Sequence, residues 1–145
     1  TRKSIPRELR RRVQTDAGGR CAYCHTLTSI TGARLVVDHI VAEAAGGQTV
    51  LENLCLACHS CNEFKGTQTQ ARDPLTGRYV RIFHPRRDRW IDHFRWSSDA
   101  TEIIGMTSIG RATLLALNMN NPLIVEARRS WNAVGWHPPS EDLPC

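Results

Sequence analysis

The sequence predicts a small α+β protein, on three observations. Apolar residues recur every four positions over residues 6–17 and a glycine pair follows, which is typical of an amphipathic helix and its end. Two short apolar runs, at residues 35–37 and 53–57, have the length of buried strands. Residues 90–96 alternate in polarity and are followed, after a turn, by an apolar run at 102–106, which predicts an antiparallel hairpin.

Capping signals predict three further helices. The first begins near residue 59 and is expected to continue to about residue 71. The second is expected over residues 109–118 with Ser108 as its cap, and the third follows Asn121, because a proline comes next and suits a first helical turn. Residues 137–145 carry no such signal and are expected to form a loose tail.

Length and composition exclude several classes of protein. The chain has 145 residues, of which 41% are hydrophobic, so it can bury a core and is neither collagen-like nor disordered. No stretch approaches the roughly 18 consecutive apolar residues that a membrane helix needs. The first six residues also lack the apolar centre of a secretory signal. We therefore expect a cytoplasmic protein without a membrane partner.

The net charge of +5 is concentrated in two segments. Residues 1–20 carry seven basic and two acidic side chains (net +5), and residues 72–95 carry seven and three (net +4). Nearly all of these basic residues are arginines, whose planar guanidinium suits phosphate, so the pattern predicts a nucleic-acid partner; two solvated arginine-rich faces are the alternative. The side chains that we expect to contact the DNA backbone are Arg10, Arg11, Arg12, Arg86, Arg87 and Arg89.

The cysteine spacing predicts a metal site. Two C-x2-C pairs, separated by 33 residues, can together supply four thiolates to one tetrahedral zinc ion. These ligands are Cys21, Cys24, Cys58 and Cys61. Disulfide bonds are one alternative, and a second is an iron–sulfur cluster, because Cys55 precedes the second pair in a C-x2-C-x2-C run. That run lacks the Cys-Pro of the bacterial ferredoxin pattern, and Cys55 lies in an apolar strand, where a thiol packs as a small hydrophobe. Cys145 fits no pairing.

The insert between the cysteine pairs holds the groups best suited to catalysis. Asp38 and His39 end the first apolar strand, and Asn62 lies on the helix after the second. Carboxylate and amide oxygens suit Mg²⁺, and a neutral imidazole suits a general base near neutral pH. We expect the imidazole and the two oxygen donors to converge around one divalent ion.

The order of these residues resembles the HNH nuclease family and its ββα-metal fold. Asn53 follows His39 by 14 residues and Asn62 comes nine later, all framed by the cysteine pairs. The resemblance covers residues 21–66. It is carried by Cys21-x2-Cys24, Val37-Asp38-His39-Ile40-Val41, Gly46-Gly47, Glu52-Asn53-Leu54 and Cys58-x2-Cys61-Asn62-x2-Lys65-Gly66.

The resemblance implies a role for each matching residue. His39 would be the general base that deprotonates the attacking water, and Asp38 and Asn62 would hold a catalytic Mg²⁺ or Mn²⁺ ion. Asn53 would form hydrogen bonds across the loop to fix the backbone and ring of His39. The four cysteines would hold a structural zinc ion. Lys65 stands where the family commonly has a lysine and would contact phosphate or stabilise the fold.

Two positions depart from the family pattern. The family often has proline three residues after the motif histidine, where this chain has Ala42, which affects the rigidity of the loop more than the chemistry. His59 lies inside the second cysteine pair and is an alternative metal ligand, although its spacing from Asn53 favours Asn62 for that role.

The resemblance therefore implies a metal-dependent DNA endonuclease, cytoplasmic and of bacterial or phage origin. A zinc-stabilised DNA-binding module without catalysis is the alternative. We expect a basic N-terminal helix in residues 1–20, the HNH nuclease core in 21–71, and an extension in 72–145 that packs on the core as one domain. Three roles remain open for the extension: completing the core, widening the DNA surface, or forming a homodimer contact.

Overall fold

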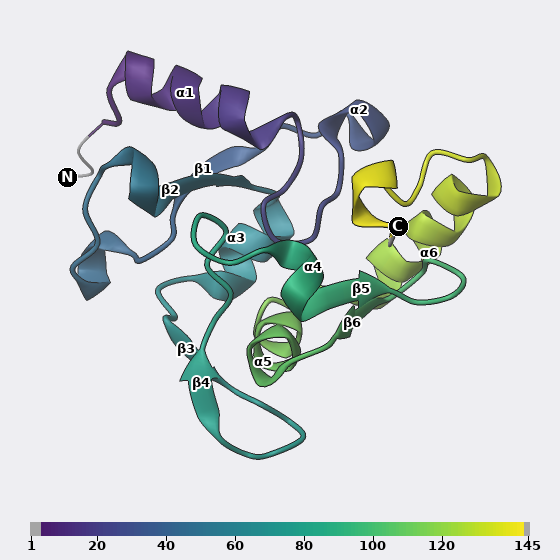
Figure 1. The fold of residues 1–145 in the computed structure, drawn as a ribbon. Helices are drawn as coiled ribbons and strands as arrows, with labels where there is room; N and C mark the ends of the chain where they lie inside the picture. The colour runs from purple at the N-terminus through teal and green to yellow at the C-terminus, as the bar shows by residue number, and fades with distance from the viewer. Residues whose placement is uncertain (1–3, 144–145) are drawn as a thin grey trace. The chain divides into compact units, whose positions relative to one another are not determined.

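The computed structural model describes residues 4–143 and has an α+β fold of helices and two-stranded antiparallel sheets (Figure 1). The chain divides into two compact units. The first unit comprises the chain up to residue 69 together with residues 84–86, and the second comprises residues 70–83 and the chain from residue 87 onward. No helix within residues 4–143 is both long and apolar enough to cross a membrane.

The first unit contains the strand–strand–helix order that the sequence predicts. Its elements are α1 (Arg7–Ala17), α2 (Thr28–Thr31), β1 (Val36–His39), the 3-10 turns η1 (Glu43–Ala45) and η2 (Leu51–Asn53), β2 (Leu54–Ala57) and α3 (His59–Lys65). Strands β1 and β2 pair antiparallel, with Asp38 opposite Cys55 and His39 opposite Leu54. Because neighbouring side chains leave a strand on opposite faces, Asp38 and His39 point to different sides of this sheet.

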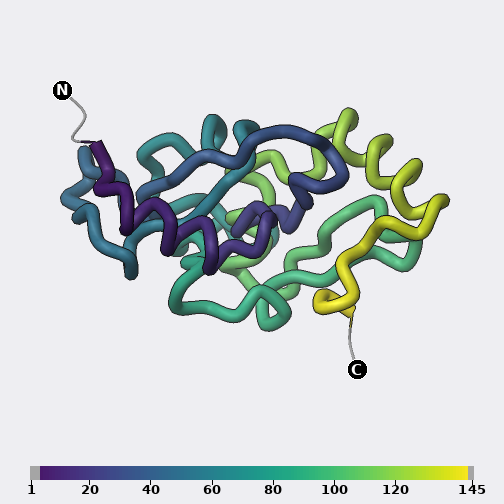
Figure 2. Tube along the Cα trace, turned by 90° about the horizontal axis from the view of Figure 1, so that it is seen from above, coloured from purple at the N-terminus to yellow at the C-terminus, as the bar shows by residue number. Residues whose placement is uncertain are grey.

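The core of the first unit lies between α1 and the β1–β2 sheet. Val13 of α1 packs against Leu54 and Leu56 of β2, and all three are buried. Leu9 and Ala17, on the same face of the helix, cover the edge of this cluster. The amphipathic helix predicted from the sequence is therefore confirmed, and α1 lies along the sheet in both views of the chain (Figures 1 and 2).

The second unit is built from two hairpins and two longer helices. Its elements are β3 (Gln70–Arg72), β4 (Tyr79–Arg81), α4 (Trp90–His93), β5 (Phe94–Trp96), β6 (Ile103–Gly105), α5 (Ser108–Ala116), α6 (Pro122–Ala133) and the 3-10 turn η3 (Ser140–Asp142). The predicted hairpin is present, because Trp96 pairs with Ile103 across β5 and β6. Trp90 and Phe94 are buried beside Trp96, as a core stripe requires.

The boundaries of several predicted elements are wrong. The helix expected to reach residue 71 ends at Lys65, because Gly66 adopts a positive φ of 52° that does not continue a helix, and residues 70–72 form a strand instead. Residues 90–93 form one helical turn rather than the start of a strand. The cap of α5 is Thr107, whose hydroxyl accepts a hydrogen bond from the Gly110 amide.

The tail expected to be loose is packed in its described part. After α6 the chain turns back toward β5 and β6 (Figure 2), and the Trp96 indole donates to the Asp142 carboxylate at 3.1 Å. The ring of His137 lies 2.9 Å from the Ala100 carbonyl oxygen and stacks edge-on against Trp96. Cys145 lies outside the described residues.

Candidate metal centre and active site

Four cysteine sulfurs gather where the two C-x2-C turns meet. The Sγ atoms of Cys21, Cys24, Cys58 and Cys61 all lie within 4.8 Å of one another. The Cys24 and Cys58 sulfurs are 3.7 Å apart, and two thiolates on a tetrahedral zinc ion with Zn–S bonds of 2.3 Å would be about 3.8 Å apart. The Cys61 amide donates to the Cys58 sulfur at 3.4 Å, which orients that sulfur as a ligand. The cluster therefore fits a tetrahedral metal ion.

The pKa values of the cysteine thiols in the cluster are also consistent with a metal ion. Hydrogen bonds from Cys21 and then Cys58 hold the pKa of Cys24 well below its ordinary value. Burial, and then hydrogen bonding to Cys24, raise the pKa of Cys21 well above its own. Three buried thiols and the half-buried Cys58 thus lie close enough to affect one another's ionisation, and a dication would stabilise all four as thiolates.

The other sulfur arrangements are not found. The five cysteines in the described part of the chain are free thiols, so none of them forms the disulfide bonds considered as an alternative. Cys55 lies apart from the cluster, with its sulfur 3.8 Å from the Tyr23 hydroxyl and 3.9 Å from Asp38, and burial raises its pKa to about 12. It packs as a neutral thiol, as the sequence predicts, and does not join Cys58 and Cys61 in an iron–sulfur arrangement. His59 is exposed and outside the cluster.

Asp38 is the centre of a buried polar network. Asp38 is 5% exposed, and its carboxylate accepts hydrogen bonds from the Tyr23 hydroxyl at 2.9 Å and from the Asn62 amide at 3.0 Å. Burial, and then the nearby Cys55 and Asp38, raise the pKa of Tyr23 well above its ordinary value, so its hydroxyl remains a donor. The structure therefore brings together the two expected metal ligands, Asp38 and Asn62.

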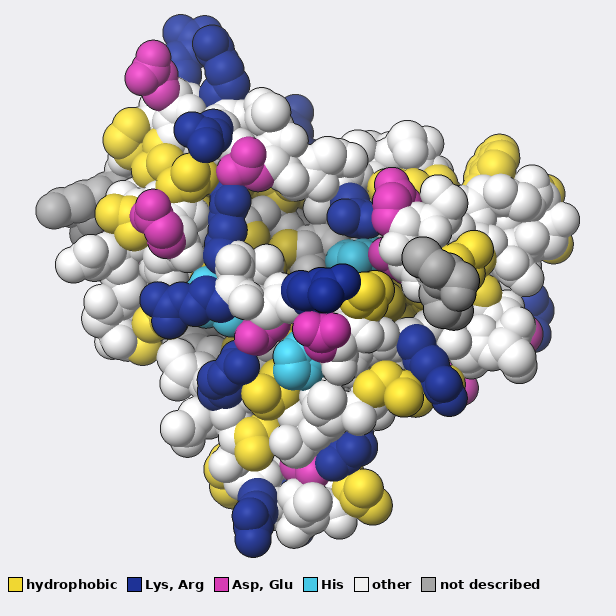
Figure 3. Space-filling model, in the orientation of Figure 1, with side chains coloured by type: hydrophobic (Ala, Val, Ile, Leu, Met, Phe, Trp, Pro, Cys, Tyr) yellow, Lys and Arg dark blue, Asp and Glu magenta, His cyan; other side chains and the backbone are white. Residues whose placement is uncertain are grey.

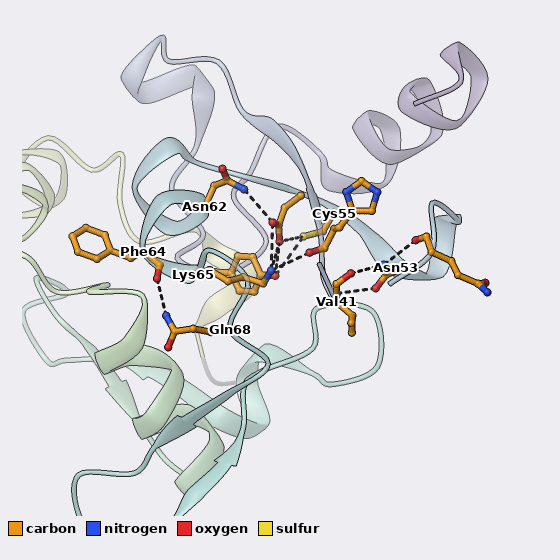
Figure 4. A network of polar contacts seen from close by, with 11 residues as sticks. Val41, Asn53, Cys55, Asn62, Phe64, Lys65 and Gln68 are labelled. Carbon is orange, nitrogen blue, oxygen red and sulfur yellow. Dashed lines mark hydrogen bonds and ion pairs between the residues drawn. The ribbon is translucent and has the colours of Figure 1, made fainter. Parts of the chain in front are cut away.

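Lys65 completes this network from the next turn of α3. Its side chain is fully buried, and its ammonium lies 3.2 Å from the Asp38 carboxylate and donates to the His39 carbonyl at 2.9 Å. Figure 4 shows Lys65 and Asn62 directed toward the same carboxylate. The expectation that Lys65 contacts nucleic acid does not agree with its burial, because the ammonium is enclosed by protein; it stabilises the fold, the other role considered for it.

His39 has its contacts on the other side of the strand. The Nε2 atom of its ring lies 3.0 Å from the Thr49 hydroxyl and 3.4 Å from the Glu43 carboxylate. Within residues 4–143, no hydrogen bond or ion pair joins this ring to Asp38 or Asn62. Asp38 and Asn62 therefore meet, as expected, but the imidazole of His39 does not join them. The ring is bound instead by Glu43 and Thr49.

Asn53 ties the ends of this segment together. Its side chain accepts from the Val41 amide at 2.8 Å and donates to the carbonyl oxygens of Val41 at 2.9 Å and Gln48 at 2.8 Å (Figure 4). These bonds cross the loop, as predicted, but they end on Val41 and Gln48 rather than on His39. Gly47 is required at the same place, because a Cβ there would lie 1.7 Å from the Val41 oxygen.

The predicted DNA contacts differ in their availability. Arg10, Arg11 and Arg12 are exposed on α1, where Figure 3 shows basic side chains together. Arg86 is used within the first unit, since its guanidinium donates to the Leu54 carbonyl at 2.9 Å and to Asp16 at 2.8 Å. Arg87 and Arg89 are exposed in the second unit.

Three contacts of the site were not predicted from the sequence: Tyr23, Glu43 and Thr49. Tyr23 lies inside the first C-x2-C turn, and its position between two metal ligands is the signal in the sequence that could have been followed. Glu43 and Thr49 contact His39 because of the way their loop folds, and residue spacing alone does not predict that conformation.

Residues 21–68 match the family model described as HNH endonuclease, about a third of the chain. The segment 21–68 is an HNH domain. This match spans both cysteine pairs, the Asp38–His39 strand end and Asn62, and so indicates membership of a nuclease family for this part of the chain. Comparisons with curated proteins and with solved structures gave no significant match.

Proposed function

We propose that the protein is a metal-dependent DNA endonuclease that hydrolyses phosphodiester bonds with one divalent metal ion and His39 as general base. The observation that supports this most strongly is the contact between Asp38 and Asn62 inside the HNH domain. The Asn62 Nδ2 atom lies 3.0 Å from the Asp38 Oδ1 atom, so two side chains that each carry an oxygen donor meet beside a strand end that carries a histidine.

Asp38 and Asn62 fit a hard divalent ion such as Mg²⁺ or Mn²⁺. Two neighbouring oxygen ligands of octahedral Mg²⁺, with metal–oxygen distances near 2.1 Å, lie about 3.0 Å apart, and the amide end of Asn62 lies at that distance from Asp38 through its Nδ2 atom. Half a turn of the Asn62 amide would direct its oxygen, rather than its nitrogen, to the site. A bound ion would act as a Lewis acid on the scissile phosphate and on the leaving 3′ oxygen.

His39 is oriented to accept a proton from water. With Nε2–H donated to Thr49 and Glu43, the lone pair is on Nδ1, for which the described part of the chain supplies no hydrogen-bond partner. The Glu43 carboxylate would stabilise the imidazolium once the proton has been accepted. Attack of the activated water on the phosphate, with the 3′ oxygen as the leaving group, yields 5′-phosphate and 3′-hydroxyl ends.

The remaining parts of the proposal concern zinc and DNA. The cysteine cluster would hold a structural zinc ion, which would tie the end of β2 and the start of α3 to the first cysteine turn. Exposed arginines on α1 and in the second unit would contact DNA phosphates and give salt-dependent affinity with little sequence information. A homodimer contact by the second unit and a cytoplasmic location stay predictions.

A zinc-stabilised DNA-binding module without catalysis is the second candidate, and two observations favour it. The Asp38 carboxylate is already paired with the buried Lys65, and the imidazole of His39 leaves the strand on the other face. In that case the network around Asp38 would have only a structural role.

Cleavage of supercoiled plasmid by zinc-loaded protein separates the two candidates. The proposal predicts nicked or linear product when MgCl2 or MnCl2 is added, and none in buffer that contains only the bound zinc. Asn62→Ala should lose cleavage and keep DNA binding. Binding without cleavage by the wild-type protein under every divalent ion would support the second candidate and reject the first.

A further inference from the structure

The side chains that contact Asp38 lie on or next to the two cysteine turns. Tyr23 lies between Cys21 and Cys24, and Asn62 directly follows Cys61. Lys65 comes one helical turn later on α3. These three side chains make the close contacts of the carboxylate, at 2.9, 3.0 and 3.2 Å.

The position of Tyr23 depends on the cysteines on either side of it. Its ring is fully buried, and the turn that carries it is joined to β2 by a hydrogen bond from the Ala22 amide to the Leu56 carbonyl at 2.8 Å. The turn is also closed by a hydrogen bond from the Cys21 amide to the Thr26 carbonyl at 3.0 Å, and the sulfurs of Cys21 and Cys24 lie within 4.8 Å of the second cysteine pair, so a bound ion would link the two turns. Tyr23 therefore joins the cysteine turn, through its backbone, to the Asp38 carboxylate, through its hydroxyl.

We infer that Tyr23 is a positioning residue that couples the cysteine cluster to the divalent-ion site by holding the Asp38 carboxylate. The zinc ion then does more than stabilise the fold, because it fixes the donor that orients a ligand of the second ion. This inference rests on the proposed function, since it takes Asp38 as a ligand of the divalent ion. Outer partners of metal ligands typically contribute about 10–100-fold to metal affinity.

The substitution Tyr23→Phe tests this coupling with the smallest change, because it removes only the hydroxyl. Lys65 is a poorer choice, since its loss would leave a buried carboxylate without a counterion. Tyr79→Phe is a matched control: Tyr79 is the second of the two tyrosines and is 73% exposed. Mn²⁺ affinity, measured by electron paramagnetic resonance on the zinc-loaded full chain, gives a readout that does not depend on cleavage.

We expect Tyr23→Phe to weaken Mn²⁺ binding by about 10–100-fold. By linkage it should also weaken zinc binding in competition with a chromogenic chelator when Mn²⁺ is present, while Tyr79→Phe changes neither affinity. A melting temperature close to that of the wild type would show that the variant is folded.

Wild-type cleavage together with unchanged Mn²⁺ and zinc affinities in Tyr23→Phe would overturn the inference and leave the proposed function standing. Mn²⁺ binding that is weakened in Tyr23→Phe, in a wild-type protein that cuts no DNA, would support the inference and overturn the proposed function. A wild-type protein that binds no Mn²⁺ would overturn both.

Discussion

The substitution Asn53→Ala should loosen the loop that holds His39 without unfolding the protein. It removes three hydrogen bonds between the Asn53 side chain and the backbone of Val41 and Gln48. Each such bond contributes about 0.5–1.5 kcal/mol net. Their sum is about 1.5–4.5 kcal/mol, and because Asn53 is half-buried, so that water replaces part of the loss, we expect about 2 kcal/mol.

Amide hydrogen exchange measures this effect directly. The Val41 amide is the one that donates to Asn53, and 2 kcal/mol of local destabilisation corresponds to roughly thirtyfold faster exchange. Glu52→Ala is the matched control, since Glu52 is the exposed neighbour and its replacement should change stability by less than about 0.5 kcal/mol. DNA cleavage should fall with Asn53→Ala, because Thr49 and Glu43 would no longer hold the ring of His39.

Unchanged exchange at Val41 in Asn53→Ala would refute this reasoning, because the three bonds would then contribute nothing to the loop. Equal acceleration in Glu52→Ala would refute it as well, since the effect would not be specific to the amide side chain.

Three further predictions concern other parts of the molecule. Cys58→Ser should lower both zinc content and melting temperature, whereas Cys55→Ala should keep the zinc, because the Cys55 sulfur lies outside the cluster. Replacing the arginines at positions 10–12 with alanine should weaken DNA binding and flatten its dependence on salt, by up to about 0.9 in slope for each phosphate that is no longer neutralised. The Arg111 guanidinium holds the pKa of Asp73 well below its usual range, so this carboxylate stabilises the second unit above about pH 4 and the stabilisation disappears as pH falls through the lowered pKa. Arg111→Lys should therefore move acid unfolding, followed by tryptophan fluorescence, to higher pH.

Each of these predictions has an outcome that contradicts it. Zinc retained in Cys58→Ser, or absent from Cys55→Ala, would reject the four-sulfur assignment. An unchanged salt slope would show that residues 10–12 do not contact phosphate. The four tryptophans of the chain all lie in the second unit, so an unchanged fluorescence midpoint in Arg111→Lys would show that the ion pair with Asp73 does not stabilise that unit.

The HNH part of the fold could be predicted because its chemistry depends on residue type and spacing. Metal-binding thiols come in pairs on tight turns, and the two short apolar runs between them have the length of buried strands. The sequence therefore predicts β1, β2, the cluster and the Asp38–Asn62 contact. The end of α3 was predicted too late in the chain, although Gly66 is the kind of residue that ends a helix, and the strand at residues 70–72 has no clear pattern in the sequence.

Two buried cations were also not predicted from the sequence. Lys65 and Arg128 look like surface residues in the sequence, yet both are fully buried. Arg128 donates to the carbonyl oxygens of Met119 and Thr101 and lies 5.0 Å from the Trp96 ring centre. Such partners come from distant positions in the chain, so no local pattern reveals them.

The central claim, that His39 is the base of a divalent-metal nuclease, is tested most directly by single-turnover cleavage with His39→Ala. Wild type and variant are compared at equal zinc content, saturating Mg²⁺ and equal DNA occupancy. The account predicts a fall in the cleavage rate of about 10²–10⁴-fold, the usual contribution of a general base. Equal rates for the two proteins would contradict it.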